Sequence, residues 1–432
     1  MKAGFAKERI TPPLGTRMMG FGQRDERMGC QSVHDDLFVR ALHVEHGGEQ
    51  ALLAGFDLCF VGREDSHRFK GALGARFGLS PRQILLNASH THGGAASGRW
   101  YAGDFLPTDP VYLRELQEAL LRAVSRARQA SVEVEIAAAT GRSRLPMNRR
   151  RLNANGRSEN RPNPTGTVCD ALPVCRLADA RGQTVCLMFS TSAHPSAQGQ
   201  FAITADYPGV AMRQLDAHLG DEASLFLQGM AGDAKTRVCG EGRDTWRQDV
   251  WEDSEKGGEL LAREVLARME QGLRPVEPTV RSALVEMEWP LAPPPARATF
   301  EAIAGDQEQD AMKRRWARRQ VEWMDRHGAL PSRWPVFAQA IQLGAGLRLI
   351  ALEGEPVAAH GRSVLDAFRE GVTLPLGYSN GEGLYLATSE MLPQGGMEVE
   401  SYWEYGPPSP LAPGMEAILA RTLEAFRRSG IE

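Results

Sequence analysis

Apolar residues recur along the chain in two alternating patterns. Short runs rich in Val, Leu, Ile and Ala predict β-strands. These runs cover residues 37–45, 50–60, 83–89, 133–139, 183–193, 223–228, 279–289, 340–352 and 372–377. Between several of them, apolar residues repeat every three or four positions, which is typical of amphipathic helices. The helical patterns cover residues 111–128, 209–219, 258–271, 357–369 and 414–428.

Together these patterns predict an α/β protein with mixed β-sheets and flanking helices. The chain has 432 residues, of which 42% are hydrophobic, so it is long enough to bury a large core. We expect one domain over residues 1–432. The loops at the strand ends would then be available for chemistry.

Two segments depart from the alternation. Residues 296–330 contain many charged side chains, and large apolar residues stand among them at Phe300, Met312, Trp316 and Trp323. Because the residues at 312, 316 and 323 fit one helix face, we expect a charged helical insertion that covers the site or binds a partner. Residues 141–168 are rich in Arg, Asn, Pro and Gly, which predicts a long irregular loop.

Composition limits the partners and the compartment. The formal net charge is −4, so we expect no general basic surface for nucleic acid or for an anionic membrane. No run is long and apolar enough to span a bilayer, and the N-terminus lacks the apolar core of a signal peptide. The six cysteines form no Cys-x-x-Cys pair, and Cys59 and Cys186 fall in apolar runs typical of buried thiols. We therefore expect a cytoplasmic protein with reduced cysteines.

Candidate chemistry appears where two predicted strands end. The strand at 83–89 runs into SHTHGG, and on an extended backbone His90 and His92 would project from the same face. Gly93 and Gly94 would leave room for a metal ion or substrate to approach. The strand at 183–193 likewise ends in His194. The alternative is that these histidines are polar residues satisfied by backbone or water, but two such strand ends among only ten histidines favour a metal site.

Seven short motifs, read in order, resemble the catalytic domain of the neutral, or alkaline non-lysosomal, ceramidases. The resemblance extends from the N-terminus to about residue 405. The motifs are ITPPLG from Ile10, VHDDLFVRA from Val33, SHTHGG from Ser89, NRR from Asn148, AHPS from Ala193, TADYPG from Thr204 and FLQGMAGD from Phe226.

The resemblance implies a set of zinc ligands. In this family the residues that match His90, His194, Glu355 and Tyr385 bind zinc. Glu353 stands where the family usually has proline. The chemistry agrees, because zinc accepts imidazole nitrogen and carboxylate oxygen and keeps a position for water. Manganese, iron or cobalt would accept the same donors. Without the resemblance, Tyr385 would be interpreted as a half-buried tyrosine beside a loop.

The resemblance implies three further site residues, and a departure from the family pattern adds a fourth. His92 would orient the water or pass a proton to the leaving amine, and Arg149 would hold the substrate carbonyl or the developing oxyanion. The alternative for Arg149 is a solvated arginine. Asp233 matches the aspartate that borders the site, but Lys235 stands where the ceramidases have a serine. Lys235 could instead attract an anionic group on the substrate.

The sequence thus predicts a zinc-dependent hydrolase that cleaves an N-acyl amide. Its substrate would be a ceramide-like lipid or a smaller, more polar amide. Secreted ceramidases have an immunoglobulin-like C-terminal domain, and its expected lack here favours the smaller amide. Two alternatives remain. The same site could hydrolyse an ester or lactone, or the chain could be a ligand-binding scaffold that has lost activity.

Overall fold

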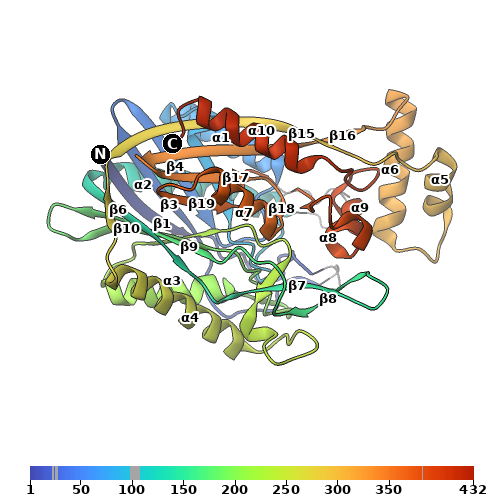
Figure 1. Ribbon diagram of the computed structural model, residues 1–432, viewed down its shortest axis with the longest axis horizontal. Helices are drawn as coiled ribbons and strands as arrows, with labels where there is room; N and C mark the ends of the chain where they lie inside the picture. The colour runs from blue at the N-terminus through green and yellow to red at the C-terminus, as the bar shows by residue number, and fades with distance from the viewer. Residues whose placement is uncertain (22–23, 25–27, 98–107, 382) are drawn as a thin grey trace.

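A computed structural model describes residues 1–21, 24, 28–97, 108–381 and 383–432, and its largest β-sheet runs through the molecule (Figure 1). Within these residues its strand order is β12-β10-β9-β6-β1-β3-β4-β5, with β14 beside β6. The β4–β5 and β10–β12 pairs are parallel, and the other neighbours are antiparallel. The strands are β1 (Lys2–Arg9), β3 (Phe38–His46), β4 (Glu49–Phe56), β5 (Ile84–Ala88), β6 (Val132–Arg142), β9 (Ala171–Asp179), β10 (Thr184–Thr191), β12 (Ser224–Gln228) and β14 (Arg274–Val276).

A second sheet packs face to face against the first. Its order is β15-β16-β17-β19, and β17 and β19 are parallel because helix α7 (Ala358–Ala367) connects them. Side chains such as Leu53 and Ile136 of the first sheet share one core with Ile341 and Leu374 of the second. The strands are β15 (Pro278–Pro290), β16 (Arg333–Gly344), β17 (Leu347–Leu352) and β19 (Val372–Leu376).

Amphipathic helices cover the outer faces of both sheets. On the first sheet, α2 contacts β1 and β3 beside α1, while α3 and α4 pack together over β12 and β6. On the second sheet, α10 lies along β15 and contacts α7 (Figure 1). The four layers confirm the predicted mixed α/β fold. The covering helices are α1 (Arg63–Phe77), α2 (Pro110–Gln129), α3 (Asp206–Leu219), α4 (Trp251–Glu270) and α10 (Met415–Arg428).

The prediction of an irregular loop over 141–168 is wrong, because most of this segment forms a hairpin. Strand β7 (Pro146–Leu152) pairs with β8 (Ser158–Asn163) on one side and with β13 (Ala234–Thr236) on the other. Its arginines hide the strand pattern in the sequence. Arg149 and Arg150 are buried nevertheless, since both form ion pairs with Glu398.

The single strand predicted at 340–352 is also wrong. The chain turns there and forms the β16–β17 hairpin, with Gly346 at a φ of +71°. A residue with a side chain rarely adopts this left-handed conformation, so the glycine marks the turn. Strand β1, strand β9 and helix α1 were not predicted.

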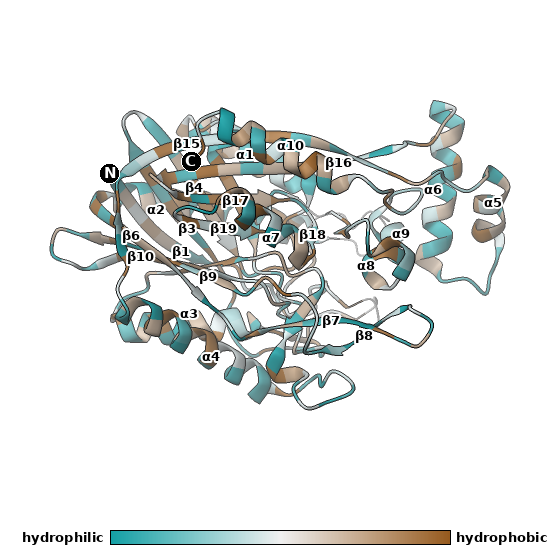
Figure 2. Cartoon of the chain, viewed as in Figure 1, coloured by the Kyte–Doolittle hydropathy of each residue, from teal (hydrophilic) through white to brown (hydrophobic). Residues whose placement is uncertain are grey.

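Two helices occupy the charged segment at 296–330. Helices α5 (Arg297–Gly305) and α6 (Ala311–His327) pack against each other at one end of the molecule, where α6 contacts α9 (Tyr402–Tyr405) (Figure 1). Phe300, Met312 and Trp316 are buried, but Trp323 is 41% exposed and therefore does not share the buried face. Figure 2 shows α6 with hydrophilic stretches over much of its length.

Two small pairings and several short turns complete the fold. All six cysteines are buried and free, which confirms the prediction for Cys59 and Cys186. In the part of the chain that the structure describes, no helix combines the length and the apolar character that crossing a bilayer requires. The small elements are β2 (Ser32–Val33) with β11 (Ala202–Ile203), β18 (Glu355–Pro356) with β20 (Tyr385–Leu386), α8 (Met397–Glu400), and single turns at Pro81–Gln83, Arg237–Cys239 and Leu392–Gln394.

Candidate metal centre and active site

One buried asparagine joins the ends of three strands beneath the candidate site. The amide nitrogen of Asn87, on β5, donates to the Gly377 carbonyl at 2.9 Å and to Ser379 Oγ at 3.1 Å, just beyond β19. Its Oδ1 accepts from the backbone N–H of Gln228, at the end of β12, at 2.8 Å. The first sheet therefore curls until β5 and β12 meet at the edge of the second sheet.

His90 follows β5 in a left-handed conformation, with a φ of +65°. Strand β5 ends at Ala88, so the expected extended geometry for His90 and His92 is wrong. This conformation is rare outside glycine and is held by its surroundings. The His90 Nδ1 lies 2.9 Å from the Cys59 carbonyl, which can only accept, so Nδ1 carries the proton and Nε2 presents a lone pair.

The expected open space at Gly93 is occupied by protein. A Cβ there would lie 2.4 Å from Thr204 Cγ2, and the Gly93 carbonyl accepts from the Thr204 backbone N–H at 3.0 Å. The glycine is thus required for two segments of backbone to approach each other. It does not leave room for a ligand.

His194 lies beyond the end of β10 and is oriented in the same way as His90. Its Nδ1 donates to the Ala231 carbonyl at 2.7 Å, which leaves the Nε2 lone pair free. The centroids of the two rings are 4.6 Å apart. An imidazole whose Nδ1 proton is held by a carbonyl is the usual arrangement of a metal-binding histidine, because that bond fixes the tautomer and the ring.

The short β18–β20 pairing, which is separate from both large sheets, contributes Glu355 and Tyr385. These two residues are direct partners in this parallel pairing. Glu355 Oε2 lies 3.0 Å from His194 Nε2 and 3.4 Å from His90 Nε2, and its Oε1 accepts from Tyr405 at 2.7 Å. The ring centroid of Tyr385 is 6.4 Å from that of His194.

The structure distinguishes Glu355 from its neighbour Glu353. Glu353 forms an ion pair with Arg63, and its Oε2 also accepts from the Phe337 backbone N–H at 3.0 Å. Between the two glutamates, Gly354 has a φ of +79°, and a Cβ there would lie 2.6 Å from the Leu384 carbonyl. The reversal at Gly354 therefore directs Glu355, and not Glu353, toward the imidazoles.

The donor atoms fit a divalent cation. His90, His194 and Glu355 are buried, and their ligand atoms lie within 4.8 Å of one another. Burial lowers the pKa of His90 to about 3, so its imidazole is neutral at neutral pH. Two imidazole lone pairs facing one carboxylate oxygen repel each other unless a cation lies between them.

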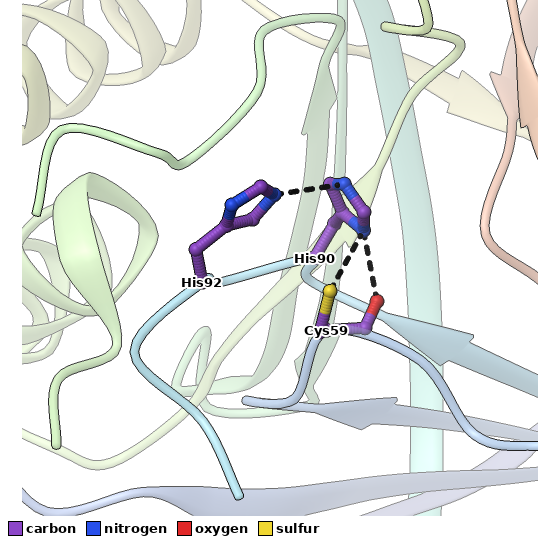
Figure 3. A group of neighbouring side chains, drawn as sticks. All are labelled: Cys59, His90 and His92. Carbon is purple, nitrogen blue, oxygen red and sulfur yellow. Dashed lines mark hydrogen bonds between the residues drawn. The ribbon is translucent and has the colours of Figure 1, made fainter. Parts of the chain in front are cut away.

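Cys59, His90 and His92 form a second group of side chains that could hold a metal ion (Figure 3). Cys59 Sγ lies 3.6 Å from His90 Nδ1, whereas His92 Nε2 lies 3.2 Å from His90 Nε2. The thiol and the second imidazole therefore lie on opposite sides of the His90 ring. Burial also raises the pKa of Cys59 well above its usual value, which keeps the thiol neutral.

His92 lies beside the candidate ligands without a strong partner of its own. Its Nδ1 is buried and has no hydrogen-bond partner among the described residues, and the Phe21 ring contacts it edge-on at 4.5 Å. Burial, followed by repulsion from His90 and His194, lowers its pKa well below the usual value. His92 is thus a neutral imidazole that could accept or release a proton at Nε2.

Arg149 and Asp233 lie next to this group but are engaged by protein atoms. Arg149 Nε bonds to Glu398 at 2.8 Å, Nη2 bonds to the Gly232 carbonyl at 2.7 Å, and the guanidinium also hydrogen-bonds Tyr385. Asp233 accepts from the backbone N–H of Ala358 at 2.7 Å, at the start of α7. Burial raises the pKa of Asp233 to about 6.

Sequence reasoning missed three buried groups around the ligands. Glu398 pairs with two arginines, Tyr405 donates to Glu355, and the Tyr378 ring lies 4.2 Å from that of His90. The Tyr378 hydroxyl is buried and has no partner in the described part of the chain. None of the three falls in a recognisable motif. Only the three-dimensional contacts identify them.

The buried histidines predict an acid sensitivity of the metal-free protein. In the folded state the pKa of His92 is below the unfolded value of about 6.5, so the unfolded chain binds more protons as the pH falls. The stability contributed by a neutral buried histidine is therefore lost below pH 6.5. We expect wild type to lose about 2 kcal/mol more unfolding free energy than His92→Asn between pH 7 and pH 5.

Urea unfolding of chelator-treated protein at both pH values measures this difference. The comparison with His92→Asn is needed because carboxyl groups with raised pKa values, such as Asp233, act in the opposite direction. Equal losses in the two proteins would contradict the prediction.

Comparison with family models and with curated proteins finds no match for this sequence. Solved structures do match, among them two ceramidases. Neutral ceramidase from Pseudomonas aeruginosa aligns with a TM-score of 0.75 and 16% identity, over 98% of this chain and 73% of that chain. A ceramidase complexed with C2 aligns with the same TM-score and identity, over 100% of this chain and 76% of that chain. The chain therefore has the fold of the neutral ceramidases.

Proposed function

We propose that the protein is a zinc-dependent hydrolase that cleaves N-acyl amides. The observation that carries the proposal is the arrangement of His90, His194 and Glu355, in which two Nε2 lone pairs meet a carboxylate oxygen in a buried site. The fold shared with the ceramidases supports an amide as substrate. A ceramide-like lipid and a smaller polar amide are both candidates.

His90, His194, Glu355 and Tyr385 would hold the ion, which when bound would supply Lewis-acid activation of a water molecule and of the scissile carbonyl. Arg149 assists Tyr385: burial raises the pKa of this phenol, and the hydrogen-bonded guanidinium acts against that rise. Arg149 thereby favours the phenolate, which is the better ligand. Tyr405 orients Glu355 through its hydrogen bond to Oε1.

His92 is the candidate for proton transfer. Its Nε2 lies 3.2 Å from His90 Nε2, so it faces the position where the reacting water and the leaving amine would meet. A neutral imidazole there can accept a proton during attack and return it to the amine.

Purified protein assayed with matched substrates tests the proposal. We expect zinc-loaded protein to hydrolyse N-acyl sphingosine or short N-acyl amides, and we expect chelation to abolish turnover until zinc is restored. The ion content is measured by elemental analysis alongside the assay. Esters with the same acyl groups form a second arm, since activated water does not select amides by itself.

Each arm has a distinct outcome. Turnover of the esters without turnover of any amide would replace the amidase by an esterase or lactonase. Stoichiometric zinc without turnover of either class would contradict a hydrolytic function and favour a binding protein.

A further inference from the structure

Lys235 presents a buried positive charge without a counterion beside the candidate active site. The residue lies on β13, is only 5% exposed, and its backbone forms a bridge with His194. In the described part of the chain, no carboxylate lies within ion-pair distance of Nζ. A buried ammonium group is costly without a partner, so this arrangement calls for an anion supplied from outside the chain.

Trp246 adds a second donor at the same place. Lys235 Nζ lies 5.3 Å from the centre of the Trp246 ring. The indole Nε1 is buried, and no acceptor for it is found among the described residues. An indole N–H can only donate, so both unpaired groups require an acceptor.

Arg24 adds a second positive charge near the candidate metal centre. Its guanidinium lies 5.0 Å from the centre of the Phe21 ring, which contacts the His92 ring edge-on. Arg24 is held there by three backbone carbonyls, of Met19, Gly199 and Gln200.

We propose that Lys235 and Trp246 bind an anionic group of the substrate, so that the enzyme selects amides that carry a carboxylate or a similar anion near the scissile bond. This inference rests on the proposed function and specifies its substrate class. The anion could lie on the amine side or on the acyl side of the amide. The experiment distinguishes these two sources.

Two matched pairs of probes test the inference. N-hexanoylglycine and its neutral amide, N-hexanoylglycinamide, place the charge on the amine side. The monoamide of adipic acid with propylamine and neutral N-propylhexanamide place it on the acyl side. In at least one pair we expect zinc-loaded wild type to show a kcat/KM about 10- to 100-fold higher for the anionic member, since hydrogen bonds to a charged group are worth that ratio.

Variants of Lys235 and Trp246 show whether the ratio of kcat/KM between the anionic and neutral substrates depends on these two donors. Lys235→Met is expected to bring it to about 1, Lys235→Arg to preserve most of it, and Trp246→Phe to reduce it while keeping the aromatic face. Lys256→Met, an exposed lysine on α4, is the matched control and should leave the ratio unchanged. Circular dichroism confirms that each variant is folded.

Binding to metal-free protein makes the result independent of turnover. Calorimetric titration with N-hexanoylglycine and N-hexanoylglycinamide, and with the acyl-side pair, should give the same preference for the anion and the same loss in Lys235→Met. Preference in binding without turnover would support the anion site and count against the hydrolase. Equal affinity within both pairs, or an unchanged ratio in folded Lys235→Met, would overturn the inference.

Discussion

Replacing His194 by alanine is expected to remove the bound ion and to lower amide turnover by about 10³-fold or more. The imidazole supplies one of three converging donors, and its Nε2 lies 3.0 Å from Glu355 Oε2. The two remaining donors of this group, the His90 imidazole and the Glu355 carboxylate, would hold zinc weakly, and water without the ion loses its activation near neutral pH. Elemental analysis after dialysis and kcat/KM on the best amide measure both effects.

His43→Ala is the matched control for this variant. His43 is also a buried histidine, but it lies on β3 and hydrogen-bonds Gln50 at 3.0 Å, away from the candidate ligands. The control should retain one ion per chain and most of its turnover. A His194→Ala protein that kept its ion and activity would rule out His194 as a ligand.

Glu398→Ala is expected to lower the free energy of unfolding by about 3 to 5 kcal/mol, the cost of breaking a buried ion pair by removing one partner. Glu398 accepts from Arg149 and Arg150, and the side chains of all three are at most 5% exposed. Burial acts to raise the pKa of Glu398, but the two arginines overcome it and lower the pKa, so the carboxylate is charged. Its loss leaves two buried guanidinium groups without a carboxylate.

Glu400→Ala provides the control within the same short helix. Glu400 pairs with Arg157, but both side chains are more than half exposed, at 55% and 52%. Exposed pairs contribute about 0 to 1 kcal/mol, so this variant should unfold nearly as wild type does. Urea unfolding at pH 7 compares the two. Equal losses would show that burial of the Glu398 pair does not determine its contribution.

The sequence predicted the elements in which buried positions recur regularly from one end to the other. Strands such as β5 and β12 are buried along their whole length, and helix α2 has one buried face, so their patterns are regular. Strand β7 was missed because paired arginines occupy buried positions in it. A hydropathy pattern shows that such residues are charged, but it does not show the ion-pair partner that permits their burial.

The candidate site was predictable in its residues and not in its geometry. SHTHGG and AHPS identify His90 and His194, but the left-handed backbone at His90 depends on contacts from elsewhere in the fold. The choice between Glu353 and Glu355 depends on the reversal at Gly354 and on Arg63, which is 290 residues away in sequence from Glu353. Local sequence carries no signal for either.

Two of the four candidate ligands precede β15 in the sequence, and the other two follow it. His90 and His194 extend from the first sheet, while Glu355 and Tyr385 belong to the β18–β20 pairing. A polypeptide cut in the exposed turn before β15 would therefore leave two fragments, each with only half of the coordination sphere. Added metal would favour their recombination, so zinc-dependent complementation between the fragments would report directly on how the two halves of the molecule dock.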